Sequence, residues 1–138
     1  GSFSLEAESS VTFENCTVSD DGLGGGARVK QNVTQGPKSS AIFRSCRAES
    51  DGGGLYAEHH HRQEAGSSAL FENCSSKRSG GGAFVQRTFT QGPKSSATFR
   101  SCRAESDGGG LNANGRYRQE TESSVFFENC SAYHDGGG

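Results

Sequence analysis

Apolar and polar residues alternate in short stretches that recur along the whole chain. In residues 40–43, Ser-Ala-Ile-Phe, the alanine and the phenylalanine fall on one face of an extended strand. A second stretch of this kind follows each of the first four glycine triplets, as in residues 55–57, Leu-Tyr-Ala. Polar segments such as residues 30–38, which contain a Gly-Pro turn signal, are expected to be loops. Glycine triplets and aromatic or β-branched alternation both disfavour helix, so the pattern predicts two short strands per segment.

The segments repeat with a fixed period of 28 residues. Triple glycines begin at Gly24, Gly52, Gly80, Gly108 and Gly136. A second marker, Phe-x-x-Cys, keeps the same spacing except for two extra residues between Cys16 and Gly24. It begins at Phe13, Phe43, Phe71, Phe99 and Phe127. A period of this length, kept over nearly five units, is the sequence signature of a repeat architecture.

The composition favours a solenoid over a compact globule. Only 30% of the 138 residues are hydrophobic and 21 are glycine, which is little material for a globular core. Disorder would fit the low hydrophobicity, but it does not require apolar residues at strictly repeated positions. We therefore expect an all-β parallel β-helix with about five coils of 28 residues, stacked about 4.8 Å apart. Residues 1–138 would form one domain, cut from a longer array; a helical-repeat solenoid is the alternative.

Stacking makes equivalent residues of successive units vertical neighbours. The residue after the phenylalanine alternates in charge, through Glu14, Arg44, Glu72, Arg100 and Glu128. Opposite charges on neighbouring strands attract by roughly 0.2–1 kcal/mol per pair, whereas like charges repel. After the glycines, large and small residues exchange places from unit to unit, beginning with Ala27 and Val29, then Leu55 and Ala57. A further column suits an amide ladder and consists of Gln35, Gln63, Gln91 and Gln119.

Two paired motifs resemble a known family. Phe71-Glu72-Asn73-Cys74 and Gly81-Gly82-Ala83-Phe84 are similar to the Phe-x-x-Asn and Gly-Gly-Ala-Ile repeats of the polymorphic outer-membrane proteins. The resemblance covers the whole chain, although the motifs are short. It implies a right-handed parallel β-helix and a role as an adhesin or surface fibre. The chain departs from the family pattern by placing cysteine where that family usually has asparagine.

Four Asn-x-Ser/Thr sequons are candidate N-glycosylation sites, at Asn15, Asn32, Asn73 and Asn129. All except Asn32 occupy one repeat position in alternate units, and serine stands there in the units between. Glycans on alternate coils would lie about 10 Å apart, twice the strand spacing, which avoids crowding. N-glycans would place the chain outside a eukaryotic cell or on its surface. The alternative is that these asparagines cap turns; the Ser-Ser pairs before each phenylalanine fit turn hydroxyls or O-linked sugar.

All cysteines share one repeat position and form a column of Cys16, Cys46, Cys74, Cys102 and Cys130. Neighbouring Cα atoms about 4.8 Å apart suit a disulfide, but in-register Cβ atoms at the same separation are slightly too far apart. The odd number also leaves one cysteine over. We therefore favour an inward column of thiols, with disulfides between adjacent coils as the alternative. No Cys-x-x-Cys spacing suggests zinc.

No group of residues suggests catalysis, a cofactor or a metal site. Residues 59–61 are three consecutive histidines, but neighbours on a strand point to opposite faces, so we expect a solvated loop rather than chelation. Three aspartates precede glycines, namely Asp51, Asp107 and Asp135. They lack the nine-residue period of the calcium-binding β-roll. A glycosidase or lyase needs carboxylates that converge in a groove, whereas these are spread over every coil.

Charge and hydropathy complete the expected function. The net charge is −2, from 14 basic and 16 acidic residues, without a basic stripe for nucleic acid, and no apolar run could span a membrane. We expect an extracellular or cell-surface structural protein, N-glycosylated and without enzymatic activity, that forms or decorates a fibre. It would self-associate head to tail or continue as a filament, since neither end has a polar cap. An adhesin or carbohydrate-binding β-helix using residues 58–62 or 116–118 is the alternative, and a polysaccharide lyase or hydrolase is a third.

Overall fold

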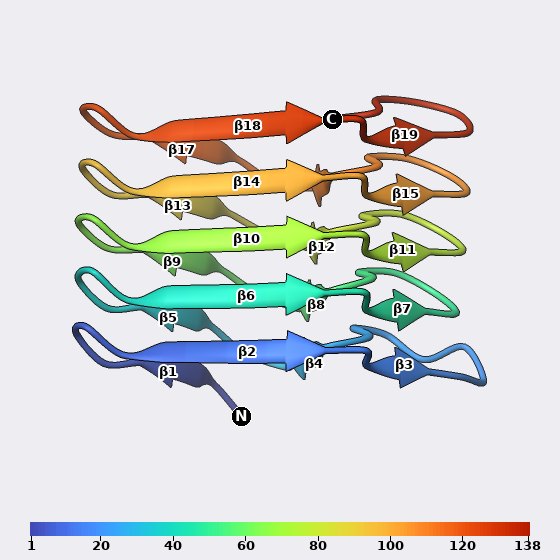
Figure 1. Cartoon of the computed structure of the whole chain (residues 1–138), viewed down its shortest axis with the longest axis horizontal. Helices are drawn as coiled ribbons and strands as arrows, with labels where there is room; N and C mark the ends of the chain where they lie inside the picture. Colours follow the sequence, from blue (N-terminus) through green and yellow to red (C-terminus); the bar gives the residue numbers. More distant parts are fainter.

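The computed structural model describes all 138 residues and contains 19 β-strands and no helix. The strands form four parallel sheets that run along a stack of about five coils, with the two termini at opposite ends (Figure 1). Equivalent strands of successive coils pair in register, as in the pairing of Phe71 with both Phe43 and Phe99. The predicted all-β parallel β-helix is therefore confirmed.

Each sheet takes one strand from successive coils. Sheet A consists of β1 (Phe3–Leu5), β5 (Val33–Gln35), β9 (His61–Gln63), β13 (Phe89–Gln91) and β17 (Tyr117–Gln119). Sheet B consists of β2 (Ser10–Glu14), β6 (Ser40–Arg44), β10 (Ser68–Glu72), β14 (Ser96–Arg100) and β18 (Ser124–Glu128). Sheet C consists of β3 (Thr17–Val18), β7 (Arg47–Ala48), β11 (Ser75–Ser76), β15 (Arg103–Ala104) and β19 (Ser131–Ala132). Sheet D consists of β4 (Ala27–Val29), β8 (Leu55–Ala57), β12 (Ala83–Val85) and β16 (Leu111–Ala113).

The coil is right-handed. In Figure 1 the strands of sheet B run from left to right at the front, those of sheet A return behind them, and each coil lies above the one before. A right-handed connection between parallel strands is the rule, because it follows the natural twist of the strands. The handedness that the family resemblance implied is thus found in the structure.

The prediction of two strands per repeat was wrong, since each full coil has four. Residues 30–38, expected to be a polar loop, contain β5, and the strands of sheet C are only two residues long. Strands this short show too little alternation to be recognised in a single repeat. They form because the coils on either side supply their hydrogen bonds, as for Arg47 N, which donates to Cys16 O over 2.8 Å.

A column of stacked phenylalanines fills the interior behind sheet B. The ring centroids of Phe43 and Phe71 lie 4.8 Å apart with an interplanar angle of 2°, and Phe71 repeats this separation with Phe99. The three rings are at most 2% exposed. On sheet D, Leu55 pairs with Ala27 below and Ala83 above, so large and small side chains alternate along the stack as predicted.

Each position of the glycine triplet has its own reason for lacking a side chain. Gly80 has a φ of +68°, in the left-handed region. A Cβ on Gly81 would lie 2.3 Å from the carbonyl oxygen of Gly109, and one on Gly82 would lie 2.6 Å from the ring of Phe99. The triplet therefore makes a tight corner in which backbone and aromatic ring approach closely, as expected from the sequence.

The two extra residues of the first unit lie in the loop that joins β3 to β4. Asp20 and Asp21 both have positive φ, of 55° and 56°. This loop extends farther than its equivalents in the coils above it (Figure 1). The register is restored beyond the loop, where Ala27 pairs with Leu55. The insertion is thus absorbed in one turn without disturbing the stack.

The chain has no helix that is long and apolar enough to cross a membrane.

We predict that Phe71→Ala lowers the free energy of unfolding by about 3–5 kcal/mol, the usual cost of removing a buried aromatic ring. Phe71 is fully buried between two stacked rings, so no neighbouring side chain can fill the space. Urea unfolding monitored by circular dichroism measures the change. Phe126→Ala is the matched control, because Phe126 is 62% exposed and its loss should have little effect. Equal losses for the two variants would contradict the stacked core.

Candidate functional site

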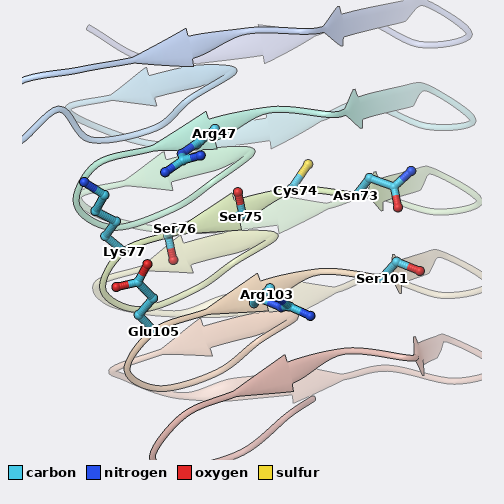
Figure 2. Close-up of a pocket in the computed structure, with 9 residues that line it drawn as sticks. All are labelled: Arg47, Asn73, Cys74, Ser75, Ser76, Lys77, Ser101, Arg103 and Glu105. Atoms are coloured by element: carbon cyan, nitrogen blue, oxygen red, sulfur yellow. The ribbon is translucent and has the colours of Figure 1, made fainter.

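The outer surface of sheet C carries a recess that extends over neighbouring coils (Figure 2). Directly after β10 the chain turns at Asn73. The φ of Asn73 is 52°, in the left-handed region that asparagine tolerates better than most residues. The two residues of β11 then point to opposite sides. Ser76 is 4% exposed, whereas Ser75 is partly exposed. The strand alternation beyond this corner thus places Ser75 on the outer surface and Ser76 inside.

The recess has a volume of about 400 Å³ and is lined mainly by polar side chains. Three cations line it, Arg47, Lys77 and Arg103, against one carboxylate, Glu105. Arg47 lies 3.7 Å from Glu49, with which Lys77 also forms an ion pair. Arg103 forms no ion pair within the chain. The recess therefore carries an excess of positive charge, which the sequence analysis did not predict.

A second depression, of about 640 Å³, lies beside sheet D. Tyr56 and Phe84 stack there with centroids 5.3 Å apart, and the inserted residue Asp21 contributes to the wall. The two aromatic residues are only 5% and 7% exposed, so neither offers an open ring face. Stacking of a sugar ring needs an exposed aromatic face, and this depression does not offer one. The expected binding loops, residues 58–62 and 116–118, line neither depression.

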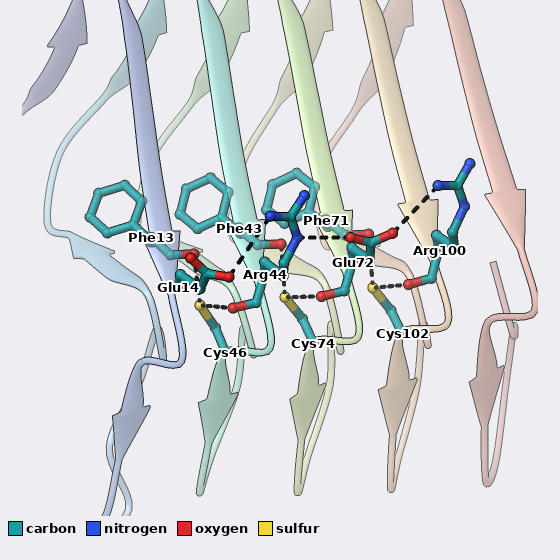
Figure 3. Close-up of polar contacts among 10 residues, drawn as sticks. All are labelled: Phe13, Glu14, Phe43, Arg44, Cys46, Phe71, Glu72, Cys74, Arg100 and Cys102. Atoms are coloured by element: carbon teal, nitrogen blue, oxygen red, sulfur yellow. Dashed lines mark hydrogen bonds and ion pairs between the residues drawn. The ribbon is translucent and has the colours of Figure 1, made fainter.

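A ladder of alternating charges runs along the outer face of sheet B (Figure 3). Glu72 accepts a hydrogen bond from Arg44 Nε at 2.9 Å and another from Arg100 at 3.4 Å. Arg44 also lies 3.8 Å from Glu14, and Arg100 Nε donates to Glu128 at 2.7 Å. The predicted ion-pair ladder is confirmed over all five coils.

The ladder shifts the pKa values of its members. The hydrogen bond and charge of Arg44, together with those of Arg100, hold the pKa of Glu72 below its usual value. Glu72 in turn raises the pKa of Arg44. A carboxylate held ionised between two arginines is poorly suited to act as a general acid near neutral pH. The charges of this ladder therefore serve the stacking of the coils.

The cysteines point into the core at the corner between sheets B and C (Figure 3). All five are free thiols, and the three of the inner coils are fully buried. Each inner thiol donates weakly to carbonyl groups; Cys74 Sγ lies 3.4 Å from the carbonyl oxygen of Phe43 in the coil below. Hydrogen bonding to the thiols of Cys130 and Cys74, together with burial, raises the pKa of Cys102, which keeps it protonated. The cysteines thus lie in one inward column, and that they remain thiols instead of forming disulfides between adjacent coils stays a prediction.

The expectation of a solvated histidine loop was wrong for one of the three residues. His59 and His60 are exposed, but His61 belongs to β9 and is 2% exposed. Its ring packs edge-on against Phe89 with centroids 4.7 Å apart. His61 occupies the repeat position of Val33, Phe89 and Tyr117, so alignment of the repeats contained the signal for burial.

The glutamine column lies next to His61 and is fully buried in the inner coils. Gln91 Nε2 donates to the side-chain oxygen of Gln63 at 3.1 Å and to the backbone oxygen of Ser124 at 2.8 Å. Gln35 Oε1 lies 3.1 Å from His61 Nε2, while His61 Nδ1 has no partner. Burial lowers the pKa of His61 to about 3, so the ring is neutral at physiological pH. The predicted amide ladder is present from Gln63 through Gln91 to Gln119, whereas Gln35 bonds to His61 instead of to Gln63.

All four sequon asparagines are exposed. The three at the shared position have φ values of 52° or 53°, and Ser45 and Ser101 at the equivalent corner have the same conformation. This conformation agrees with the turn-forming role considered for these asparagines, while their exposure is compatible with an attached glycan. Asn32 differs, because its side-chain oxygen accepts a hydrogen bond from the backbone of His60 at 3.4 Å. N-glycosylation of these asparagines stays a prediction.

The aspartates before the glycines have local partners. Asp51 accepts a hydrogen bond from the backbone N–H of Ser79 at 2.9 Å, and Asp107 from the hydroxyl of Ser106 at 3.3 Å. No group of three or more histidine, cysteine, aspartate or glutamate side chains is arranged to hold a metal ion. These aspartates thus stabilise turns beside the glycine corner.

Comparison of the chain with protein-family models, curated proteins and solved structures finds no match. The repeat β-helix that the motifs implied is present in the structure, while kinship with the polymorphic outer-membrane proteins stays a prediction.

We predict that His61→Phe makes the protein less sensitive to acid. Because the native pKa of His61 is about 3 and the unfolded value is near 6.5, the unfolded chain binds the extra proton first as the pH falls. This residue's contribution to stability is complete above about pH 6.5 and should decrease by roughly 2–3 kcal/mol by pH 4.5. Urea unfolding at pH 7.5 and pH 4.5 measures it. Phenylalanine suits the site, as Phe89 shows one coil above.

The exposed neighbour provides the control for this variant. His59→Ser should show the same loss of stability in acid as the unchanged chain, since His59 is exposed. If the His61→Phe variant and the unchanged chain lose equal stability between the two pH values, His61 does not have the low native pKa.

We predict that Glu72→Arg lowers the urea midpoint, because it replaces two attractions with two repulsions between neighbouring strands. Glu128→Arg is the matched control; Glu128 pairs with Arg100 alone, so its replacement should have about half the effect. In 1 M salt the Debye length falls to about 3 Å, and both effects should shrink. A salt-independent loss would indicate damage to packing instead of the ladder.

Proposed function

We propose that this chain is a structural segment that forms or decorates an extracellular fibre and has no enzymatic activity. The observation that supports this best is the continuity of its columns. The aromatic column extends from Phe13 to Phe127, and the charged column from Glu14 to Glu128, without an exception in any coil. Contacts that are repeated in every coil stabilise a rod along its axis.

The charge alternation of sheet B bears on how coils could join in a filament. Glu72 lies between Arg44 and Arg100, so each coil meets an opposite charge in the next. A junction that continues this alternation would be stabilised, whereas one that places glutamate on glutamate would be destabilised, because like charges on neighbouring strands repel.

The sequons support an extracellular, decorated fibre. Three of them lie at the same exposed corner between sheets B and C, on every second coil. The separation of about 10 Å leaves room for a row of sugars along one edge of the rod. A polar coat of this kind would shield the solenoid from lateral association.

The charged ladder gives no support to the lyase or hydrolase alternative. The glutamates of sheet B are each directed at arginine, with Glu72 placed between two of them. A glycosidase requires one carboxyl group kept protonated and a second that faces the same sugar. The adhesin alternative is supported by one feature, the positively charged recess of sheet C, and needs no catalytic group.

We predict that the purified native protein forms unbranched filaments with a repeat of about 4.8 Å along the axis, the spacing of neighbouring strands. Cryo-electron microscopy checks this directly. Treatment with an N-glycosidase should lower the intact mass, and the density of the sugars should lie on every second coil. The corner at Ser101 is the internal control, because it has the same backbone but no sequon. Isolated particles in place of filaments would refute the fibre, and an unchanged mass would refute N-glycosylation.

A further inference from the structure

One outer column of sheet C departs from the alternation of charge. It consists of Thr17, Arg47, Ser75, Arg103 and Ser131, paired in register from coil to coil. Two arginines thus stand on either side of a serine, with no carboxylate in the column (Figure 2). Their Cα atoms are separated by two coils, about 10 Å. The small serine side chain leaves the space between them open, and this space is part of the recess of sheet C.

The neighbouring ladder shows what such a space can hold. In sheet B, Glu72 lies between Arg44 and Arg100, which are also two coils apart. One carboxylate there receives Arg44 Nε at 2.9 Å and Arg100 at 3.4 Å (Figure 3). The protein itself therefore demonstrates that a single oxyanion bridges two arginines at this separation. Sheet C has the same arrangement of arginines without the bridging group.

The charges around Ser75 are incompletely neutralised. Arg103 has no ion-pair partner, not even Glu105, which also lines the recess, and the contact of Arg47 with Glu49 is 3.7 Å long. Glu49 is shared with Lys77, which also lines the recess. Guanidinium groups bind carboxylate and sulfate through paired hydrogen bonds, and the hydroxyl of Ser75 adds a further donor.

We propose that the recess over Ser75 binds an oxyanion group, carboxylate or sulfate, carried by an acidic polysaccharide. The bound group would lie between Arg47 and Arg103, where the carboxylate of Glu72 lies in the neighbouring column. A polymer is favoured over a free ion because the site is open to water, where one exposed pair of charges binds weakly. The arginines recur at the period of two coils, so a chain with regularly spaced charges gains from several contacts at once. The net charge of −2 and the lack of exposed aromatic faces at the recess disfavour nucleic acid.

The chain contains a natural control on the outer face of sheet A. There Thr90 lies between Arg62 and Arg118, which are separated by the same two coils. No depression is found at this position. Binding that depends only on the density of positive charge would use both columns, whereas binding in the recess would use sheet C alone.

The test measures binding of polygalacturonate and of dextran sulfate to the immobilised chain by surface plasmon resonance. The chain is produced without N-glycans, because Asn73 lines the recess, so the glycan proposed for it would lie beside the site, and because Ser75→Glu would also remove its sequon. Ser75→Glu supplies the missing carboxylate from within the protein, and the double variant Arg47→Gln with Arg103→Gln removes the binding groups. The controls are Thr90→Glu and the double variant Arg62→Gln with Arg118→Gln. An ionic strength of about 0.15 M limits long-range attraction to about 8 Å.

We expect at least one polysaccharide to bind, and each sheet C variant to weaken it by about tenfold or more, against less than about twofold for each control. The polysaccharide that binds identifies the oxyanion as carboxylate or sulfate. Ser75→Glu should leave the unfolding midpoint equal or higher, which separates loss of the site from loss of the fold. Equal losses from the two columns, tighter binding of single-stranded DNA at the same residues, or binding of neither polysaccharide would overturn the proposal. The site needs only this chain, so its failure would leave the fibre proposal standing.

Discussion

The structure depends on one constraint, the in-register stacking of equivalent residues at the spacing of neighbouring strands. Every side chain has its own repeat equivalents directly above and below it, as Phe71 has Phe43 and Phe99. Rings tolerate this arrangement because they stack, and amides tolerate it because they both donate and accept. Charges do not, since identical ions at this distance repel. Glutamate and arginine alternate in sheet B because of this constraint. This alternation is the clearest evidence in the sequence that equivalent residues stack in register.

The same constraint decides which parts of the fold could be predicted from the sequence. The phenylalanine and glutamate–arginine columns were predictable, because alignment of the repeats places their members on neighbouring strands once a coil is assumed. The strands of sheet C were not, since two residues carry too little alternation to be recognised alone, and the strands of sheet A were missed because they lie in largely polar segments. His61 was misplaced for a related reason: three consecutive histidines indicate a polar loop, while the aromatic residues at its repeat position indicate burial. The residues at the same repeat position predict burial better than the neighbours in sequence do, because they are the residues that pack against the side chain.

The recess over Ser75 could not be predicted from the sequence. Arg47 and Arg103 are visible in the repeats, but the total charge is balanced and nothing in the sequence indicates an unpaired site. Its recognition requires knowing that Ser75 points outward from a two-residue strand, while Ser76 points inward. It also requires knowing that Glu49 and Lys77 are already paired with each other. Burial and ion pairing are properties of the assembled coils. The structure is therefore needed to show that no carboxylate lies between Arg47 and Arg103 in the outer column of sheet C.

A period of two units is the shortest that can satisfy these columns. A solenoid of identical units would place arginine on arginine or glutamate on glutamate in every coil, whereas two unit types allow each charge to meet its opposite. The same two-unit period separates Arg47 from Arg103 by one serine, so it sets both the stability of the sheet B ladder and the spacing of the recess. In an alternating column every further unit meets an opposite charge, so each added coil contributes one more attraction to the ladder. Each period of two units therefore carries one glutamate and one arginine in sheet B and one arginine and one serine in the outer column of sheet C, so the ladder and the arginine spacing of the recess follow from the same alternation.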